Sequence, residues 1–238
     1  MLVLFMRLTE IDVSYKTIER LYSDQEVILG LHNLHTLILK KKGVGEVDGC
    51  GDGTGYALTV KKHYASEAQK LKDKIKEGNS DKIHLKTLFV FYFALIDIKS
   101  RMYIGYGTSF KSEQEAFFSA IVMIKGTGII INSLRLDRYY SAQFYVGFIE
   151  QHLGKVELYF IPKKNATVKG PWEWKRMLYY FVTDPVTYLE EYFKRNQSES
   201  GIAEDKKRTG WKLGQKREDR IDTANALTTL WHNLYWLG

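Results

Sequence analysis

The stretch LKTLFVFYFALID, residues 85–97, decides the fold. It is a nearly continuous apolar run rich in phenylalanine and β-branched residues, which is typical of a strand buried on both faces of a sheet. The run is too short to span a membrane, which needs roughly 18 apolar residues. Residues 98–101 predict a turn, and residues 102–108 predict a second strand that returns beside the first.

The segments on either side of this hairpin predict a mixed sheet. Before it, the glycine-rich stretch GEVDGCGDGTGYALTV, residues 45–60, predicts a strand with a bend. The lysine-rich residues 61–86 predict an exposed insertion with a helical piece near residues 65–77. After the hairpin, helix, strand, helix and strand alternate, at residues 112–125, 129–136, 141–153 and 156–161. Three antiparallel strands followed by β-α-β units predict an α/β fold, a mixed five-stranded sheet flanked by helices.

Both ends of the chain are predicted to be helical. Ser14 suits the N-cap of a helix over residues 15–22, and Ser23 with Glu26 forms a capping box for a second helix that ends at residues 40–43. This pair resembles the back half of a helix-turn-helix that would offer Lys16 and Arg20 to DNA, although a plain helical hairpin has the same pattern. The chain therefore divides into a short helical segment, residues 1–43, and an α/β domain, residues 44–238.

The C-terminal part is also predicted to be mainly helical. Residues 172–182 are aromatic and fit either a helix or a strand. Asp184 suits an N-cap with Pro185 at the first helical position, which opens a helix that runs to about Arg208. A final helix is predicted over residues 218–235.

Composition excludes several classes of protein. The single cysteine, Cys50, excludes a disulfide framework and a cysteine-rich zinc module. Phosphate-binding P-loops, strand-GxGxxG-helix units, H-E-x-x-H and G-x-S-x-G motifs are all absent from the sequence. Without a membrane span or a signal peptide, the expectation is a soluble intracellular protein. The net charge of +7 favours a polyanionic partner, though ordinary solvated lysines would give the same excess.

The candidate catalytic residues are acidic. Asp52 lies among glycines that let the backbone bend, and Asp137 directly follows a predicted strand. Active-site residues of α/β sheets gather at such strand ends. Asp48 and Asp97 compete with them, but Asp97 looks like a residue of the hairpin turn.

A third acidic candidate lies in YFKRNQSESGIAEDK, residues 192–206. Tyr192, Arg195, Glu199 and Lys206 fall at about 0°, −60°, −20° and −40° around a helix, so they share one narrow face. A glutamate between two phosphate-binding cations suits a metal ion beside a nucleic-acid backbone, although charged helix faces are often only solvated. Gly201 interrupts the helix, which predicts a kink or a close approach of DNA.

These motifs resemble the DDE transposases of prokaryotic insertion sequences that carry the signature Y-(2)-R-(3)-E-(6)-K. Residues 192–206 reproduce that spacing, DGTG at Asp52 resembles the first-aspartate strand, and LRLDRYYSAQ with FIPKKNA resembles the second-aspartate block around Asp137. The resemblance covers about residues 45–236. It implies an RNase H-like catalytic domain over residues 44–238.

The resemblance also implies a chemistry. Asp52, Asp137 and Glu199 would form a triad that holds two Mg²⁺ ions, with Mn²⁺ as a substitute. The reaction would be phosphodiester hydrolysis at the ends of the element, followed by strand transfer into target DNA. Contacts to the DNA backbone would come from Tyr192, Arg195, Lys206 and Lys164, and further DNA contacts from Lys16 and Arg20. A homodimer would form in the synaptic complex, and the protein would work in the prokaryotic cytoplasm at the nucleoid.

Three features depart from the resemblance. Only about 60 residues separate Asp137 from Glu199, which leaves no room for a large β-rich insertion. Trp172 and Trp174 lie in this interval, where they suit either core packing or stacking on an extruded base. The N-terminal helix pair is short for a complete DNA-binding domain. Two alternatives therefore stay open: a DNA-binding remnant that has lost catalysis, and an RNase H-like nuclease or resolvase.

Overall fold

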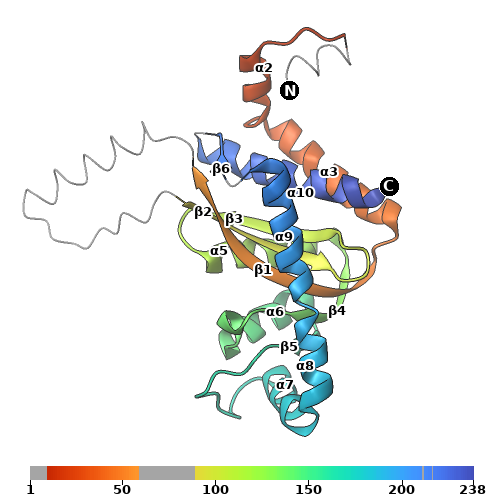
Figure 1. The fold of residues 1–238 in the computed structure, drawn as a ribbon, viewed down its shortest axis with the longest axis vertical. Coiled ribbons are helices and arrows are strands. Elements are labelled where there is room, and N and C mark those ends of the chain that lie inside the picture. The colour runs from red at the N-terminus through yellow and green to blue at the C-terminus, as the bar shows by residue number, and fades with distance from the viewer. Residues whose placement is uncertain (1–9, 59–88, 211, 216) are drawn as a thin grey trace, which may run out of the picture.

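The computed structural model describes residues 10–58, 89–210, 212–215 and 217–238 (Figure 1). The predicted insertion at residues 61–86, with its helical piece at residues 65–77, lies outside the described residues.

A mixed sheet forms the centre of the molecule. Its strands are β1 (Glu46–Leu58), β2 (Phe89–Asp97), β3 (Tyr103–Ser109), β4 (Ile130–Arg135) and β5 (Glu157–Tyr159), in the order β3-β2-β1-β4-β5. β1, β2 and β3 pair antiparallel, and β4 and β5 continue the sheet parallel to β1. This order is consistent with an RNase H-like fold. The predicted mixed sheet is confirmed, with a sixth strand, β6 (Lys212–Leu213), parallel to the end of β1.

Helices cover both faces of the sheet. The described helices are α2 (Tyr15–Leu21), α3 (Gln25–Lys42), α5 (Glu113–Thr127), α6 (Gln143–Leu153), α7 (Trp172–Thr183), α8 (Pro185–Phe193), α9 (Asn196–Thr209) and α10 (Glu218–Leu237), with a 3₁₀ turn at Arg138–Tyr140. Phe93 and Leu95 of β2 join one apolar cluster with residues of α5 and α6, whereas Tyr92 and Ile96 join a second cluster with Ile221 of α10. β2 is therefore buried on both faces, as its apolar run predicted.

The turns and caps test the local predictions. Asp97 is a turn residue, as predicted: its Oδ2 accepts a hydrogen bond from the Ser100 N–H at 2.8 Å. Ser112 caps α5, and Asp184 caps α8 with Pro185 at the first turn. The predicted capping box of Ser23 and Glu26 is wrong, because Asp24 caps α3 and accepts from the Glu26 N–H at 2.9 Å.

Two further predictions about helices are resolved. The ambiguous residues 172–182 form a helix, α7. The single helix predicted to run to Arg208 is divided into α8 and α9 at Lys194 and Arg195, although both residues keep helical backbone angles.

The N-terminal helices lie against the C-terminal helix. α3 packs on α10, and the Thr223 hydroxyl donates to the Tyr22 carbonyl at 2.7 Å. Lys16 and Arg20 lie on α2 and are exposed. Figure 1 places α2 at one end of the molecule and α7 with α8 at the other.

His35 makes the docking of α3 sensitive to pH. It is fully buried, packs edge-on against Tyr106, and lies with Nδ1 3.4 Å from the Asn233 amide nitrogen. Burial lowers the pKa of His35 to about 4, so the folded protein keeps the ring neutral. A lowered histidine pKa means that the unfolded chain takes up the proton first. Stability is then complete above about pH 6.5 and falls as the pH drops toward 4.

Because of His35, we expect the free energy of unfolding to be about 2 kcal/mol smaller at pH 5 than at pH 7. Urea unfolding at both pH values, for the wild type and for His35→Met, measures it. The variant has no titrating ring and should lose less stability on acidification. Equal losses in the two proteins would contradict the assignment.

Candidate active site

A gap in the sheet marks the candidate site. β4 pairs with β1 only as far as Cys50 opposite Arg135, and β6 pairs again at Ala57 and Leu58. Within the described parts of the chain, no strand pairs with that edge of β1 between residues 51 and 56. Asp52 lies in this interval, and Asp137 lies two residues beyond the end of β4. The gap is thus at the carboxyl end of β4, where α/β sheets commonly place active sites.

Helix α9 packs over this part of β1. Ser198 hydrogen bonds the Cys50 thiol, and alternation along the strand puts Asp52 on the same face as Cys50 and Thr54. Lys206, which is 6% exposed, donates to the Thr54 hydroxyl and, at 3.2 Å, to the Gly55 carbonyl. The predicted DNA-contacting Lys206 therefore lies against β1 in this structure. Burial lowers the pKa of Lys206, and nearby Asp52 opposes that shift.

Arg195 is the common neighbour of the three predicted catalytic carboxylates. Its Nη1 lies 2.8 Å from Glu199 Oε1, and its guanidinium lies 5.4 Å from the centre of the Tyr192 ring. The pKa of Arg195 is raised, against the effect of burial, by Tyr192, Glu199, Asp137 and Asp52. The structure therefore pairs Glu199 with Arg195 directly, and the charges of Asp52 and Asp137 act on the same guanidinium.

Asp52 is the most perturbed carboxyl group of the site. Burial is the main cause that raises its pKa to about 6, and the negative charges of Glu199 and Glu113 add to it. The Gly53 N–H and Arg195 act in the opposite direction. Burial and the neighbouring carboxylates thus both disfavour the charged form of Asp52.

Glu113 is a fourth carboxylate of the site, and the sequence prediction missed it. It begins α5, and a Cβ added at Gly53 would lie 2.3 Å from its Cδ, so the glycine leaves room for it. Its Oε1 accepts a hydrogen bond from the Tyr140 hydroxyl at 2.6 Å. Tyr140 ends the 3₁₀ turn that Asp137 caps. Glu113 therefore links the elements that carry Asp52 and Asp137, but in the sequence it looks like an ordinary acidic residue of a first helical turn.

Arg135 fixes the end of β4 to the end of α8. It is 3% exposed, and its Nε donates to the Glu191 carbonyl at 2.9 Å while Nη2 bonds the Glu191 carboxylate. Its guanidinium also lies 4.8 Å from the centre of the Tyr159 ring. This clamp sets the position of Arg195, four residues after Glu191, relative to Asp137, two residues after Arg135.

The site's oxygens suit a magnesium ion by type but are not arranged around one. Carboxylates are the ligands that Mg²⁺ prefers. Among the residues that the structure describes, however, no three His, Cys, Asp or Glu side chains are grouped closely enough to hold a metal ion. Glu199 is paired with Arg195 instead.

One comparison identifies the family. The chain is 43% identical, over 235 residues, to a protein of Archaeoglobus fulgidus described as a probable transposase for insertion sequence element ISA1214; the match covers 99% of this chain and 67% of that protein. The chain belongs to this transposase family. No family model matches the transposase, and no solved structure matches it. In its described residues, no helix is long and apolar enough to cross a membrane.

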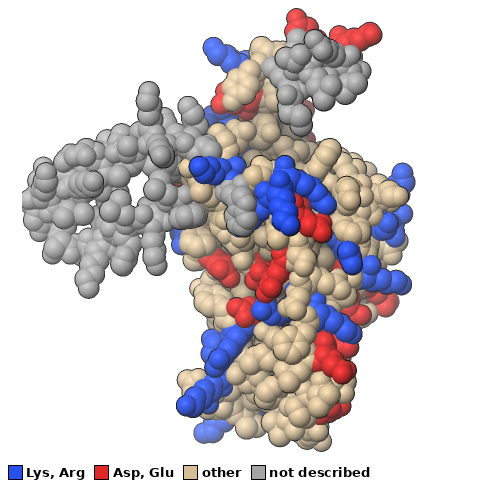
Figure 2. Space-filling model, in the orientation of Figure 1, with Lys and Arg blue, Asp and Glu red and all other residues tan. Residues whose placement is uncertain are grey.

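The charges on one face of the transposase are segregated. Figure 2 shows acidic side chains midway along the molecule, with basic side chains above and below them. Lys164 is exposed on the loop between β5 and α7, and the neighbouring Lys163 donates to the Tyr139 carbonyl at 3.2 Å, close to Asp137 in the sequence. The two tryptophans differ: Trp174 is in the core and donates to the Thr167 carbonyl at 2.8 Å, whereas Trp172 is 70% exposed.

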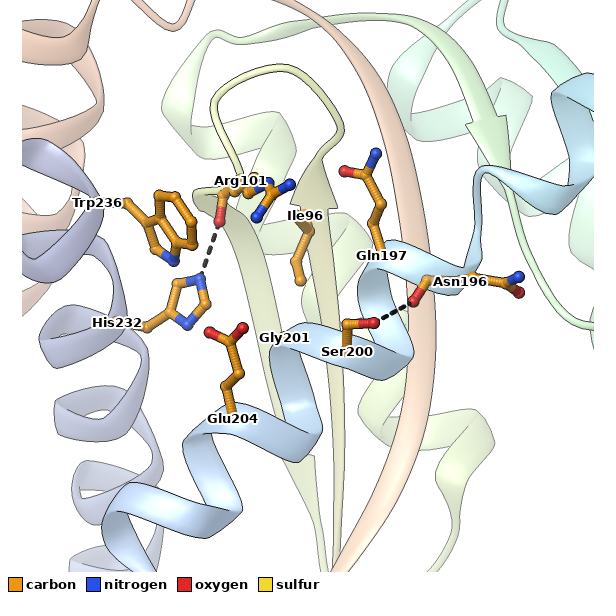
Figure 3. Close-up of a pocket in the computed structure, with 9 residues that line it drawn as sticks. All are labelled: Ile96, Arg101, Asn196, Gln197, Ser200, Gly201, Glu204, His232 and Trp236. Atoms are coloured by element: carbon orange, nitrogen blue, oxygen red, sulfur yellow. Dashed lines mark hydrogen bonds between the residues drawn. The ribbon is translucent and has the colours of Figure 1, made fainter.

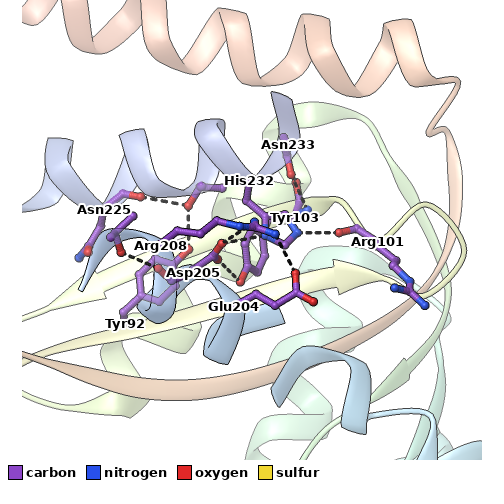
Figure 4. Close-up of polar contacts among 11 residues, drawn as sticks. Tyr92, Arg101, Tyr103, Glu204, Asp205, Arg208, Asn225, His232 and Asn233 are labelled. Carbon is purple, nitrogen blue, oxygen red and sulfur yellow. Dashed lines mark hydrogen bonds and ion pairs between the residues drawn. The ribbon is translucent and has the colours of Figure 1, made fainter. Parts of the chain in front are cut away.

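Polar contacts within the core hold α9 against the sheet of the transposase (Figure 4). Asp205 of α9 accepts from the Tyr103 hydroxyl at 2.6 Å and lies 2.9 Å from His232 Nδ1 of α10. His232 Nε2 lies 2.8 Å from the Arg101 carbonyl in the β2–β3 turn. The helix that carries Glu199 is thus fixed to two strands and to α10.

The packing of α9 explains why a glycine lies at position 201. A Cβ there would lie 2.5 Å from Ile96 Cδ1, so the glycine lets α9 approach β2 closely. The predicted close approach of DNA is therefore not needed to explain it, and α9 continues through this residue. A pocket of about 330 Å³ lies beside Gly201 (Figure 3), and Arg101, Gln197, Glu204 and Trp236 are among the residues that line it.

Proposed function

We propose that this transposase is of the DDE type, with Asp52, Asp137 and Glu199 as its catalytic carboxylates. The observation that supports the proposal is that Glu199 pairs with Arg195 while the charges of Asp52, at the gap between β4 and β6, and of Asp137 act on the same guanidinium. The gap follows the end of β4, and Asp52 lies half-buried on this edge of β1. The spacing of Tyr192, Arg195, Glu199 and Lys206 supports the same assignment.

The proposed reaction is phosphodiester hydrolysis at the ends of the insertion sequence, followed by strand transfer. Two Mg²⁺ ions, for which Mn²⁺ can substitute, would be held by Asp52, Asp137 and Glu199; when bound, they activate the attacking oxygen and stabilise the leaving oxygen. The chain itself binds and orients DNA. Arg195 and exposed lysines such as Lys164 contact the phosphates, which also makes binding sensitive to salt. Tyr192, expected from the sequence to contact DNA, is 6% exposed and packs in the core beside Arg195.

The remaining residues have supporting roles in the proposal. Buried Lys206 holds β1 at Thr54 and Gly55, next to Asp52. Lys16 and Arg20, exposed on α2, contact DNA farther from the cleavage site. Two ends are cut together in a synaptic complex by a homodimer, at the nucleoid in the cytoplasm of a prokaryotic cell.

The test uses supercoiled DNA that carries the sequences flanking the gene. We expect nicks at the ends of the element and joining to target DNA, dependent on Mg²⁺ and absent in Glu199→Gln. Equal activity in the wild type and Glu199→Gln would reject the site. Salt-sensitive DNA binding without cleavage would support the inactive remnant, and cleavage of branched DNA without joining would support the nuclease or resolvase.

A further inference from the structure

Arg195 forms an ion pair with Glu199 at the candidate site. Its guanidinium bonds Glu199 at 2.8 Å and is electrostatically coupled to Asp52 and Asp137. The Arg195 side chain is 18% exposed, while that of Glu199 is 48% exposed. The Nε atom is buried and has no hydrogen-bond partner within the described structure. Arg195 therefore pairs with Glu199 through Nη1, while its Nε–H makes no hydrogen bond to the described residues.

A cation that binds these carboxylates has to compete with Arg195. The guanidinium cannot give up its charge by losing a proton, because its pKa lies far above neutral pH. It can leave the carboxylates only by moving to another anion, and a backbone phosphate accepts two of its N–H groups at once. Glu199 is half exposed, so this phosphate can approach the ion pair from the solvent side.

We propose that Arg195 is an exchangeable counter-ion. In the absence of DNA it pairs with Glu199 and lowers the affinity of the site for divalent cations; when DNA binds, it transfers to a phosphate and releases Glu199. This inference rests on the proposed function.

The exchange couples DNA binding to cation binding. By linkage, DNA raises the affinity for the cation by the same factor by which the cation raises the affinity for DNA. Removing the charge of Arg195 should raise the cation affinity of the DNA-free protein, because a positive charge paired with Glu199 repels a divalent ion that approaches this carboxylate. From the Coulomb energy of such charges near a protein surface, we expect an increase of about tenfold to a hundredfold.

The experiment measures Mn²⁺ binding to the full chain without DNA, by the paramagnetic resonance signal of free Mn²⁺. Arg195→Gln should bind at least about tenfold more tightly than the wild type, and Arg195→Lys, which keeps the charge, should stay near the wild type. Arg208→Gln is the matched control, because Arg208 pairs with Glu204 at 3.0 Å on the same helix with the same spacing of four residues. It should leave the affinity unchanged. Circular dichroism melting shows that each variant is folded.

A second measurement adds a short DNA duplex. The duplex should tighten Mn²⁺ binding in the wild type but much less in Arg195→Gln, which has no guanidinium to transfer. Unchanged or weaker Mn²⁺ binding by DNA-free Arg195→Gln would overturn the inference. If Mg²⁺-dependent nicking by the wild type persists, that result leaves the proposed function standing. If the wild type neither nicks DNA nor binds Mn²⁺, the inference about Arg195 and the proposed function are both overturned.

Discussion

Asp52→Asn is expected to slow DNA nicking by about a thousandfold or more, equivalent to about 4 kcal/mol of activation free energy. The substitution keeps the shape of the side chain but removes the charge that we propose holds a divalent ion. Asp52 lies on a strand that is paired with β2 from Gly49 to Ala57, so the fold should persist. Single-turnover nicking in Mg²⁺, followed on denaturing gels, measures the effect.

Asp48→Asn is the matched control. Asp48 lies on the same strand and the same face, four residues before Asp52, but it is opposite β4 and accepts a hydrogen bond from the Ser133 hydroxyl. Its variant should nick DNA at a rate close to that of the wild type. Full activity in Asp52→Asn would show that the assigned site is wrong. An equal loss in both variants would show that any change on this strand face disturbs the protein.

The sheet could be predicted because its signals are local. The apolar run of residues 85–97 fixes a strand buried on both faces, and Asp97 with Arg101, which has a φ of 60°, closes the turn that follows it. The caps at Ser112 and Asp184 were also correct, since a cap depends on a few neighbouring residues. Where two polar residues were adjacent, at Ser23 and Asp24, the pattern did not distinguish them, and the prediction chose the wrong one.

The features of the fold that the sequence did not predict depend on contacts between distant parts of the chain. The two-residue strand β6 has no periodicity of its own and exists because it pairs with the end of β1. The break between α8 and α9 lies next to Glu191, which Arg135 holds from β4. Trp172 and Trp174 have the same local pattern, and only packing decides that Trp174 is buried.

The candidate site was likewise predictable only where its contacts are between residues close together in the sequence. Helical spacing placed Arg195 and Glu199 together, and they form an ion pair. The same spacing gave no information on where Lys206 would point, because its partners, Thr54 and Gly55, lie about 150 residues earlier. Glu113 was missed for a similar reason, since its place beside Asp52 depends on how α5 packs on β1.

Gly107→Ala is expected to destabilise the fold more than other single-methyl changes, by about 3 kcal/mol or more. Gly107 lies on β3 where the strand meets α5, and a Cβ there would lie 2.0 Å from the Ala116 carbonyl oxygen and 2.7 Å from the Ala120 nitrogen. Both are backbone atoms inside a helix, so no side chain can rotate to make room. The strand and helix would have to separate, which opens the aromatic core around Phe117. Urea unfolding followed by circular dichroism measures the loss.

Gly126→Ala provides the comparison within the same helix. No atom lies within 4 Å of a Cβ at Gly126, near the end of α5, and alanine is favoured over glycine within a helix by up to about 1 kcal/mol. This variant should be slightly more stable than the wild type. If the two variants were equally stable, β3 and α5 would not be in backbone contact. The two aspartate-bearing elements depend on that contact, because Glu113 at the start of α5 bonds Tyr140 and lies against Gly53. We therefore expect a folded but weakened Gly107→Ala protein to lose nicking activity at a lower temperature than the wild type.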